Sequence, residues 1–441
     1  MHEEIVRRAP GNGAVWHNLA ATLGDAGRNE EAVTAARRAF AAGLDAPETW
    51  LVMARALLGL GQLDEAESAF REALKRRPAD KTAHRDLAQL LWMRTNDVEK
   101  ALAVLNDAIG REPHNLDLRM TRAHVLGQCG DADAEYGEML VVLSRSGGAP
   151  AIELAAANAA LAAGKGETAI THARHVMRAL SEHAGVREVY CRALLAVGEA
   201  KEASDIAAAL HQEAPLNQNY IAYLATAWRL LADERYHALY DYEAFVIPGE
   251  LDAPPGWANR KTYLKDLVEA LDRRHQFATH PFGQSVRHGS QLASINMIDE
   301  PALKAYSKAA AGPIRRYLDA VGKGRDPLRS RNEGRFEIIT AWSIRLPASG
   351  FHIDHVHSQG WLSSACHLRL PEATGADERA GWLKFGEPGI PTAPKLPAEH
   401  FIKPQEGVLV IFPSYMWHGT VPFSGEKTRL TVAVDIAPGR P

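Results

Sequence analysis

The first half of the chain alternates apolar and polar residues with the period of an α-helix. Its apolar positions recur three or four residues apart, the spacing that gives a helix one apolar face. In one segment these positions are Trp50, Met53, Ala54, Leu57, Ala66, Phe70 and Ala73. Gly61 stands between the two parts of this segment, so the pattern predicts two helices joined by a tight turn.

This helical pair repeats along the chain. Glycines recur at Gly27, Gly61, Gly130, Gly164 and Gly198, in steps of 34 residues with one step of 35 hidden between Gly61 and Gly130. Alanines keep the same period at Ala32, Ala66, Ala101, Ala169 and Ala203. Such a period is typical of solenoids, in which each helix pair packs on the next. We count about six units, degenerate after the third, and expect an α-solenoid over residues 1–240.

The pattern changes from residue 241 onward. The sequence Pro254-Pro255-Gly256 ends the solenoid pattern, and helices are expected around 260–275 and 299–321. Short β-branched and aromatic runs follow, and they predict strands at 336–346, 351–357, 361–370, 381–388, 407–413 and 428–436. Strands at short, even spacing favour a sandwich or barrel. The expected fold is therefore α + β and multidomain, with a mainly β domain and flanking helices over residues 241–441.

The last predicted strand carries a cation and a hydroxyl on one face. Side chains alternate along a strand, so Arg429 and Thr431 share the face opposite Leu430 and Val432. An arginine on the inner face of a small barrel is costly to bury unless it binds an anion. Two other interpretations stay open: Arg429 as a surface cation paired with Glu426 or Asp435, and Thr431 as an ordinary strand-forming residue.

A second candidate site lies in residues 352–357, where three histidines and an aspartate stand close together. In an extended strand His352 and Asp354 face one side, whereas His355 and His357 face the other. Only one of these pairs can point inward, together with His418 at the exit of the apolar strand 407–413. Imidazole and carboxylate groups that converge in this way are typical metal ligands.

Both halves resemble known families. The repeat resembles the tetratricopeptide repeat, and "H-x-D-H-x-H", His418 and "R-L-T" at 429–431 resemble the Fe(II)/2-oxoglutarate-dependent oxygenases. "LSSACHL" at 362–368 and "GVLVIFPSYMWH" at 407–418 are similar to one branch of that superfamily, which itself carries tetratricopeptide repeats. The resemblance covers most of residues 250–441.

The resemblance implies a double-stranded β-helix, or jelly-roll, that holds Fe(II) and takes 2-oxoglutarate as cosubstrate. It implies His355, His357 and His418 as metal ligands, with His352 and Asp354 as the alternative pair for the first two. Arg429 and Thr431 would hold the far carboxylate of 2-oxoglutarate, and no catalytic residue is expected beyond the metal ligands. The sequence departs from the branch at His357, where a carboxylate is usual, and at Cys366 and His367, where two tyrosines are usual.

Composition and charge narrow the possible partners. The formal net charge is −4 and the pI is about 6.6, so the chain offers no basic surface for nucleic acid or an anionic membrane. The three cysteines are far apart, and the N-terminal residues lack the apolar core of a signal peptide. We therefore expect a cytoplasmic protein without disulfides or a membrane-spanning segment.

These features favour a 2-oxoglutarate-dependent hydroxylase whose repeat domain recruits a protein or peptide substrate. One alternative is a three-histidine metal enzyme that does not use 2-oxoglutarate, either a zinc hydrolase or a cupin-like dioxygenase. Another is a non-catalytic repeat scaffold with a metal-free β domain. The sequence indicates neither the substrate nor the oligomeric state.

Overall fold

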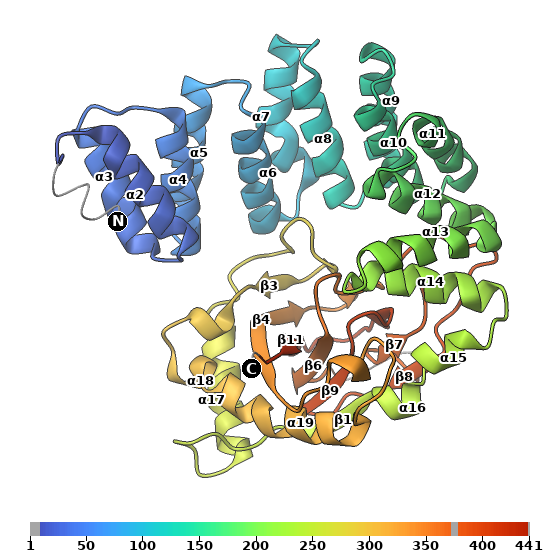
Figure 1. The fold of residues 1–441 in the computed structure, drawn as a ribbon. Coiled ribbons are helices and arrows are strands. Elements are labelled where there is room, and N and C mark those ends of the chain that lie inside the picture. Colours follow the sequence, from blue (N-terminus) through green and yellow to red (C-terminus); the bar gives the residue numbers. More distant parts are fainter. Residues whose placement is uncertain (1–8, 372–377, 440–441) are drawn as a thin grey trace. The chain divides into compact units, whose positions relative to one another are not determined.

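The computed structural model describes residues 9–371 and 378–439, and the chain divides into two compact units, Met1–Gly147 and Gly148–Pro441. Residues 1–8, on which the expected absence of a signal peptide rests, lie outside the described part. Figure 1 shows helices in both units and strands in the second. Each unit is described by itself.

The first unit consists of antiparallel helix pairs. Its helices are α2 (Gly13–Asp25), α3 (Asn29–Ala41), α4 (Pro47–Gly59), α5 (Leu63–Arg76), α6 (Lys81–Thr95), α7 (Val98–Arg111), α8 (Leu116–Gln128) and α9 (Ala132–Arg145). The periodic alanines are buried between the two helices of each pair, where larger side chains would hold the helices apart: Ala32 and Ala66 are fully buried. This packing explains the strict period.

The turns inside the pairs explain both the glycines and the irregular step. Gly27, Gly61 and Gly130 have φ angles of 73°, 74° and 97°, a left-handed conformation that favours glycine. In the step of 35 residues the corresponding position is Asn96, with φ 53°. Asparagine is the residue other than glycine that tolerates this conformation best, so the period continues without a glycine.

The second unit begins with further helices of the same kind. They are α10 (Pro150–Ala162), α11 (Gly166–Ala179), α12 (Ala184–Val197), α13 (Ala200–Glu213) and α14 (Gln218–Leu230), followed by the short α15 (Arg235–Leu239) and α16 (Tyr242–Phe245). From α2 to α13 the described chain thus contains six pairs, the number expected, and α14 follows them without a full-length partner. The two compact units divide before α10. The boundary predicted at residue 240 lies elsewhere, because it was placed where the helical repeat pattern of the sequence ends.

The rest of the second unit is built on antiparallel sheets. Its strands are β1 (Ile247–Glu250), β2 (Val286–Arg287), β3 (Ser290–Leu292), β4 (Phe336–Leu346), β5 (Phe351–His352), β6 (Leu362–Arg369), β7 (Leu383–Phe385), β8 (His400–Ile402), β9 (Val408–Pro413), β10 (His418–Thr420) and β11 (Arg429–Pro438). A six-stranded sheet has the order β1-β9-β6-β11-β4-β3, and smaller sheets contain β10-β7-β8 and β2-β5. The expected α + β multidomain fold is confirmed.

Helices of this region are α17 (Arg260–Asp272), α18 (Pro301–Lys304) and α19 (Tyr306–Val321), with 3-10 turns η1 (Ile295–Met297) and η2 (Arg329–Arg331). The helix expected at 299–321 is thus split into α18 and α19. α17 packs against β6, and α19 packs against β1 and β9. Together they cover part of the large sheet.

The strand predicted at 351–357 is much shorter than expected. Only Phe351 and His352 form β5, which pairs with β2. Ile353 still donates to the Ser285 carbonyl, next to β2, but His355 then pairs with His418 of β10. A segment that changes partner within three residues has no continuous ladder, so the alternation of faces assumed for an extended strand does not apply to it.

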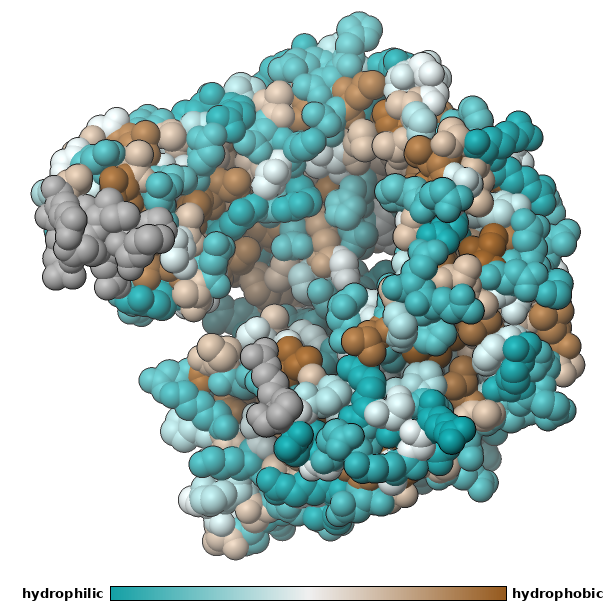
Figure 2. Space-filling view, viewed as in Figure 1, coloured by the Kyte–Doolittle hydropathy of each residue, from teal (hydrophilic) through white to brown (hydrophobic). Residues whose placement is uncertain are grey.

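Most of the surface seen in one view is hydrophilic (Figure 2). Figure 2 shows one face, on which hydrophobic residues form small, scattered patches. In the part of the chain that the structure describes, no helix is long and apolar enough to span a membrane. Cys129, Cys191 and Cys366 are all free thiols, as expected.

Candidate metal centre

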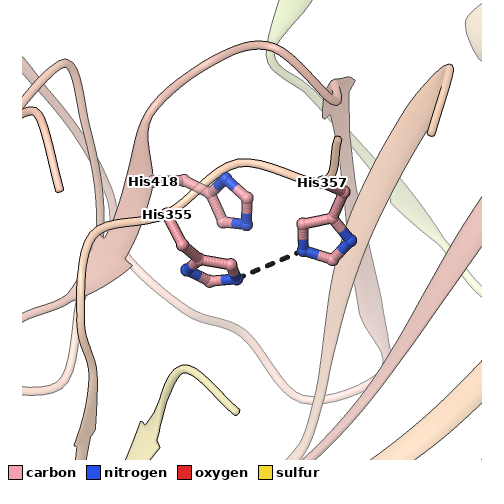
Figure 3. Close-up of side chains that lie close together, drawn as sticks. All are labelled: His355, His357 and His418. Carbon is pink, nitrogen blue, oxygen red and sulfur yellow. Dashed lines mark hydrogen bonds between the residues drawn. The ribbon is translucent and has the colours of Figure 1, made fainter. Parts of the chain in front are cut away.

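Three histidines converge on one point in the second unit. The ligand nitrogens of His355, His357 and His418 all lie within 4.8 Å of one another, the one such group of potential metal ligands among the described residues. Figure 3 shows the three rings facing a common space. The Nε2 atoms of His355 and His357 are 3.2 Å apart. Two nitrogens bound to one metal at about 2.1 Å are separated by roughly 3.0–3.4 Å, so this spacing fits a shared ion.

The hydrogen bonds of the outer ring nitrogens fix how the histidines are protonated. The Nδ1 atoms of His355 and His418 lie 2.8 Å and 2.9 Å from the carbonyl oxygens of Ile353 and Met416. Nδ1 of His357 lies 2.6 Å from Asp435 Oδ1. Carbonyl and carboxylate oxygens accept hydrogen bonds, so each Nδ1 carries a hydrogen, and in the neutral form of the ring each Nε2 has a free lone pair. Three lone pairs this close repel one another, and a bound cation would relieve the repulsion.

Backbone hydrogen bonds hold the histidines in place. His355 and His418 exchange both of their backbone hydrogen bonds, at 3.0 Å and 3.1 Å, although they are far apart in sequence. His418 also belongs to β10, which pairs with β7. The backbone N–H of His357 donates to the Ser414 carbonyl. The segments that carry the three histidines are therefore tied to each other by their own backbone hydrogen bonds.

Burial keeps the rings of His355 and His418 uncharged. Burial, reinforced by the neighbouring His357, lowers the pKa of His355 to about 3. Burial likewise holds the pKa of His418 well below its usual value, with His355 as a further cause. Neutral imidazoles are the form that binds Zn²⁺, Fe²⁺ or another divalent transition metal, so the donor set fits such an ion.

The alternative pair lies outside this group. His352 lines the same cavity, but its Nδ1 is 3.0 Å from Ser285 Oγ. Asp354 is turned toward β7, where Lys384 donates to its Oδ2 at 2.8 Å. Burial raises the pKa of Asp354 to about 6. Neither residue belongs to the converging group. The alternation of an extended strand predicted that His352 and Asp354 share a face, but His352 lines the cavity and Asp354 points toward β7.

The histidines and Arg429 line one cavity of about 330 Å³ between the large sheet and β7 and β10. Arg429 is 1% exposed, and burial lowers its pKa to about 10, so it stays charged at neutral pH. Its Nε donates to Thr431 Oγ1 at 3.3 Å and its Nη1 to the Gly381 carbonyl at 2.9 Å. Its Nη2 donates to His367 Nε2. A guanidinium has five N–H bonds, so two remain for another acceptor.

The predicted alternation along β11 is confirmed. Arg429 and Thr431 line the cavity, and so do Ala433 and Asp435 further along the strand. The alternative of a surface cation does not hold, because Arg429 is buried and its contacts are Thr431, Gly381 and His367. Asp435, one of the partners considered for it, contacts His357 instead. Asp435 shares the parity of Arg429, so the sequence held a signal for it that was overlooked.

Two further residues complete the walls of the cavity. Gln284 and Gln291 lie at its edge, where Nε2 of Gln291 donates to Oε1 of Gln284 at 2.8 Å.

His367 is deeply buried behind Arg429, and its Nδ1 has no hydrogen-bond partner among the described residues. His367 and Cys366 occupy the positions where tyrosines were expected.

The last full-length repeat helix supports both ligand segments from outside. The backbone N–H of Gln218, at the start of α14, donates to the Ser358 carbonyl, next to His357. The indole of Trp417, next to His418, donates to Thr226 Oγ1 of α14 at 2.9 Å. Tyr240 Oη accepts from the Trp417 backbone at 3.1 Å and donates to the Tyr415 carbonyl at 2.9 Å. The second unit thus joins repeat helices and metal-site segments in one packed body.

Comparison with family models identifies both parts of the chain. Residues 340–435 match the family described as "Putative 2OG-Fe(II) oxygenase", and residues 51–115 match the tetratricopeptide repeat. The first match contains all three converging histidines and Arg429, whereas the second lies in the first unit. The chain therefore combines tetratricopeptide repeats with a region matched by this oxygenase family, as the sequence motifs predicted.

Among solved structures the chain is similar to repeat proteins. A thermophilic TPR protein from Thermus thermophilus shares 23% identity over 42% of this chain and 99% of its own, with a TM-score of 0.31. The type IV pilus biogenesis factor PilW shares 18% identity over 48% of this chain and 97% of its own, with a TM-score of 0.37. These scores carry no functional argument. No curated protein matches the chain.

Proposed function

We propose that the protein is an Fe(II)- and 2-oxoglutarate-dependent dioxygenase that hydroxylates a protein or peptide substrate recruited by its repeats. In this proposal His355, His357 and His418 hold the metal, and Arg429 and Thr431 hold the far carboxylate of 2-oxoglutarate. The observation that carries the proposal is the presence, in one cavity, of three converging imidazole lone pairs and a buried arginine with N–H bonds to spare.

The arginine separates this proposal from the other metal chemistries. A zinc hydrolase or a dioxygenase without 2-oxoglutarate needs the histidines, but not a buried cation further along the same cavity. A guanidinium binds a carboxylate through two parallel hydrogen bonds, which suits a dicarboxylate anchored at its far end. The family match over 340–435 supports the same interpretation.

When bound, Fe(II) and 2-oxoglutarate would supply the oxidising chemistry of this family, in which dioxygen oxidises 2-oxoglutarate to succinate and carbon dioxide and adds its second oxygen atom to the substrate. The protein's residues bind and orient. The three imidazoles turn Nδ1 outward and aim Nε2 into the common space, while Arg429 would fix one end of the cosubstrate. Trp342 and Phe412 line the same cavity and would limit the access of water to the reacting groups. We interpret the two antiparallel sheets around the cavity as the double-stranded β-helix of this family.

The repeats support the choice of a macromolecular substrate. Tetratricopeptide repeats form extended inner surfaces that commonly bind protein segments, and the second unit contains both repeat helices and the cavity. We also propose a cytoplasmic location, supported by three free thiols in the described residues, since such cysteines are typical of reducing compartments.

The test is anaerobic titration of metal-stripped protein with Fe(II) and then 2-oxoglutarate, followed by visible absorption. We expect a charge-transfer band from the chelate in the wild type and its loss in Arg429→Ala. Metal binding without a band, together with tight retention of zinc, would favour the hydrolase alternative. A protein that bound neither metal nor 2-oxoglutarate would be a scaffold.

A further inference from the structure

The outer hydrogen bonds of the three histidines are not equivalent. His355 and His418 donate to neutral backbone carbonyls, whereas His357 donates to a carboxylate at a shorter distance, 2.6 Å. Hydrogen bonds to an ionised acceptor are shorter and roughly twice as strong as neutral ones. One of the three rings is thus held, and made a better electron donor, by a negative charge.

Asp435 is fixed in position by a directed chain of hydrogen bonds. Ser363, directly opposite Asp435 on β6, donates from its Oγ to Asp435 Oδ1 at 3.1 Å. Ser363 and Ser414 are joined by their hydroxyls at 2.8 Å, and since the proton of Ser363 is used on the carboxylate, Ser414 must be the donor. The Ser414 carbonyl in turn accepts the backbone N–H of His357. The chain thus ends at the backbone of His357, the same residue whose ring Asp435 holds.

The position of the carboxylate matters as much as its presence. Asp435 is outside the group of nitrogens that converge, and it reaches His357 through Nδ1, the nitrogen that faces away from the common space. It therefore adds charge without taking a coordination position. Three neutral imidazoles leave a divalent ion with its full charge of +2, whereas one adjacent carboxylate reduces the net charge to +1. Two histidines and one directly bound carboxylate give the same net charge.

We propose that Asp435 is a positioning residue of the metal centre: it orients His357 and supplies, through that ring, the negative charge that a three-histidine set lacks. This inference rests on the metal ligands of the proposed function, but not on the use of 2-oxoglutarate. Carboxylates that hold a ligand histidine in this way typically change metal affinity by about 10- to 100-fold when removed.

The experiment compares Asp435→Asn with Asp354→Asn in the full-length chain. Asp354 is a matched control, because its carboxylate is also buried near the histidines but pairs with Lys384 rather than with a ring. The dissociation constant for Co(II) is measured by competition with a chelator, and the visible bands of the bound Co(II) are recorded. We expect Asp435→Asn to weaken Co(II) binding by about 10- to 100-fold and to shift the bands, with both unchanged in Asp354→Asn.

Asp435→Glu tests whether the loss of Co(II) affinity in Asp435→Asn comes from the lost charge or from a folding defect. It keeps the negative charge, so we expect it to bind Co(II) more tightly than Asp435→Asn, and metal-free melting curves show whether each variant folds. Equal Co(II) affinities for the wild type and Asp435→Asn would overturn the inference, as would a wild type that binds no divalent metal. Tight Co(II) binding without any 2-oxoglutarate band with Fe(II) would remove the proposed function and leave the role of Asp435 standing.

Discussion

The two ends of the cavity are organised in opposite ways. At the histidine end, residues from two separate segments turn their hydrogen-bearing nitrogens outward and leave three bare lone pairs facing inward. At the arginine end, a single strand supplies Arg429 and Thr431, and the protein already occupies three of the guanidinium's donors. The first end presents converging nitrogens that would suit a cation, whereas the second is a charged group with three of its five N–H bonds used by its own neighbours. Replacing a side chain should therefore reduce binding affinity more at the histidine end than at the arginine end.

The largest effect should come from removing a ligand at the histidine end. His418→Ala removes one of three converging nitrogens, and we expect metal affinity to fall by more than about 100-fold, beyond the loss typical of outer partners. Metal content after desalting measures this. The control is His352→Ala, which changes a cavity histidine outside the group and should retain metal. Loss of metal in both His352→Ala and Asp354→Ala would assign the first two ligand positions to the alternative pair, since His418 is a ligand in either assignment.

A smaller and separate effect is expected at the arginine end. Arg429→Ala should reduce 2-oxoglutarate affinity by about 2–4 kcal/mol, or roughly 30- to 1000-fold, because a buried charged partner of the carboxylate is lost. Metal affinity should stay within a few-fold of the wild type. Calorimetric titration with each ligand measures both, and Arg429→Lys shows how much of the loss is due to charge alone. Unchanged 2-oxoglutarate affinity would remove the role assigned to Arg429.

The smallest effect should come from Thr431→Val. This change keeps the size and strand preference of the side chain but removes a hydroxyl that Arg429 Nε contacts at 3.3 Å. Loss of one hydrogen bond predicts a decrease of about 0.5–1.5 kcal/mol in 2-oxoglutarate binding, or roughly 2- to 10-fold. The same titration measures it. No change at all would show that Thr431 is only a strand residue.

The sequence could predict the features that depend on local patterns of residues. The repeat helices and β4 follow from local spacing, and the bounds of β4 agree with the predicted 336–346. Even the missing glycine in the step of 35 residues has a local explanation, since Asn96 adopts the same left-handed turn. The faces of β11 were likewise predictable, because alternation along one strand needs no knowledge of its partners.

The histidine end depended on information that no local pattern holds. Residues 353–357 lie outside β5, and His355 pairs with His418 of a distant strand, so alternation could not decide between the two pairs. The resemblance to a known family, rather than strand parity, singled out His355 and His357. The hydrogen bond from Trp417 to Thr226 joins residues 191 positions apart, and nothing in either segment indicates the other.

The hydrogen bond between Trp417 and Thr226, and those around it, also limit how the repeat array can evolve. An array of repeats can gain or lose units, since each contacts mainly the next. In this chain the repeat units are not equally free to be gained or lost, because α14 is hydrogen-bonded to the segments that carry His357 and His418. Units far from α14 can be added, deleted or exchanged to suit a new partner, while α14 itself must be inherited together with the metal-site domain.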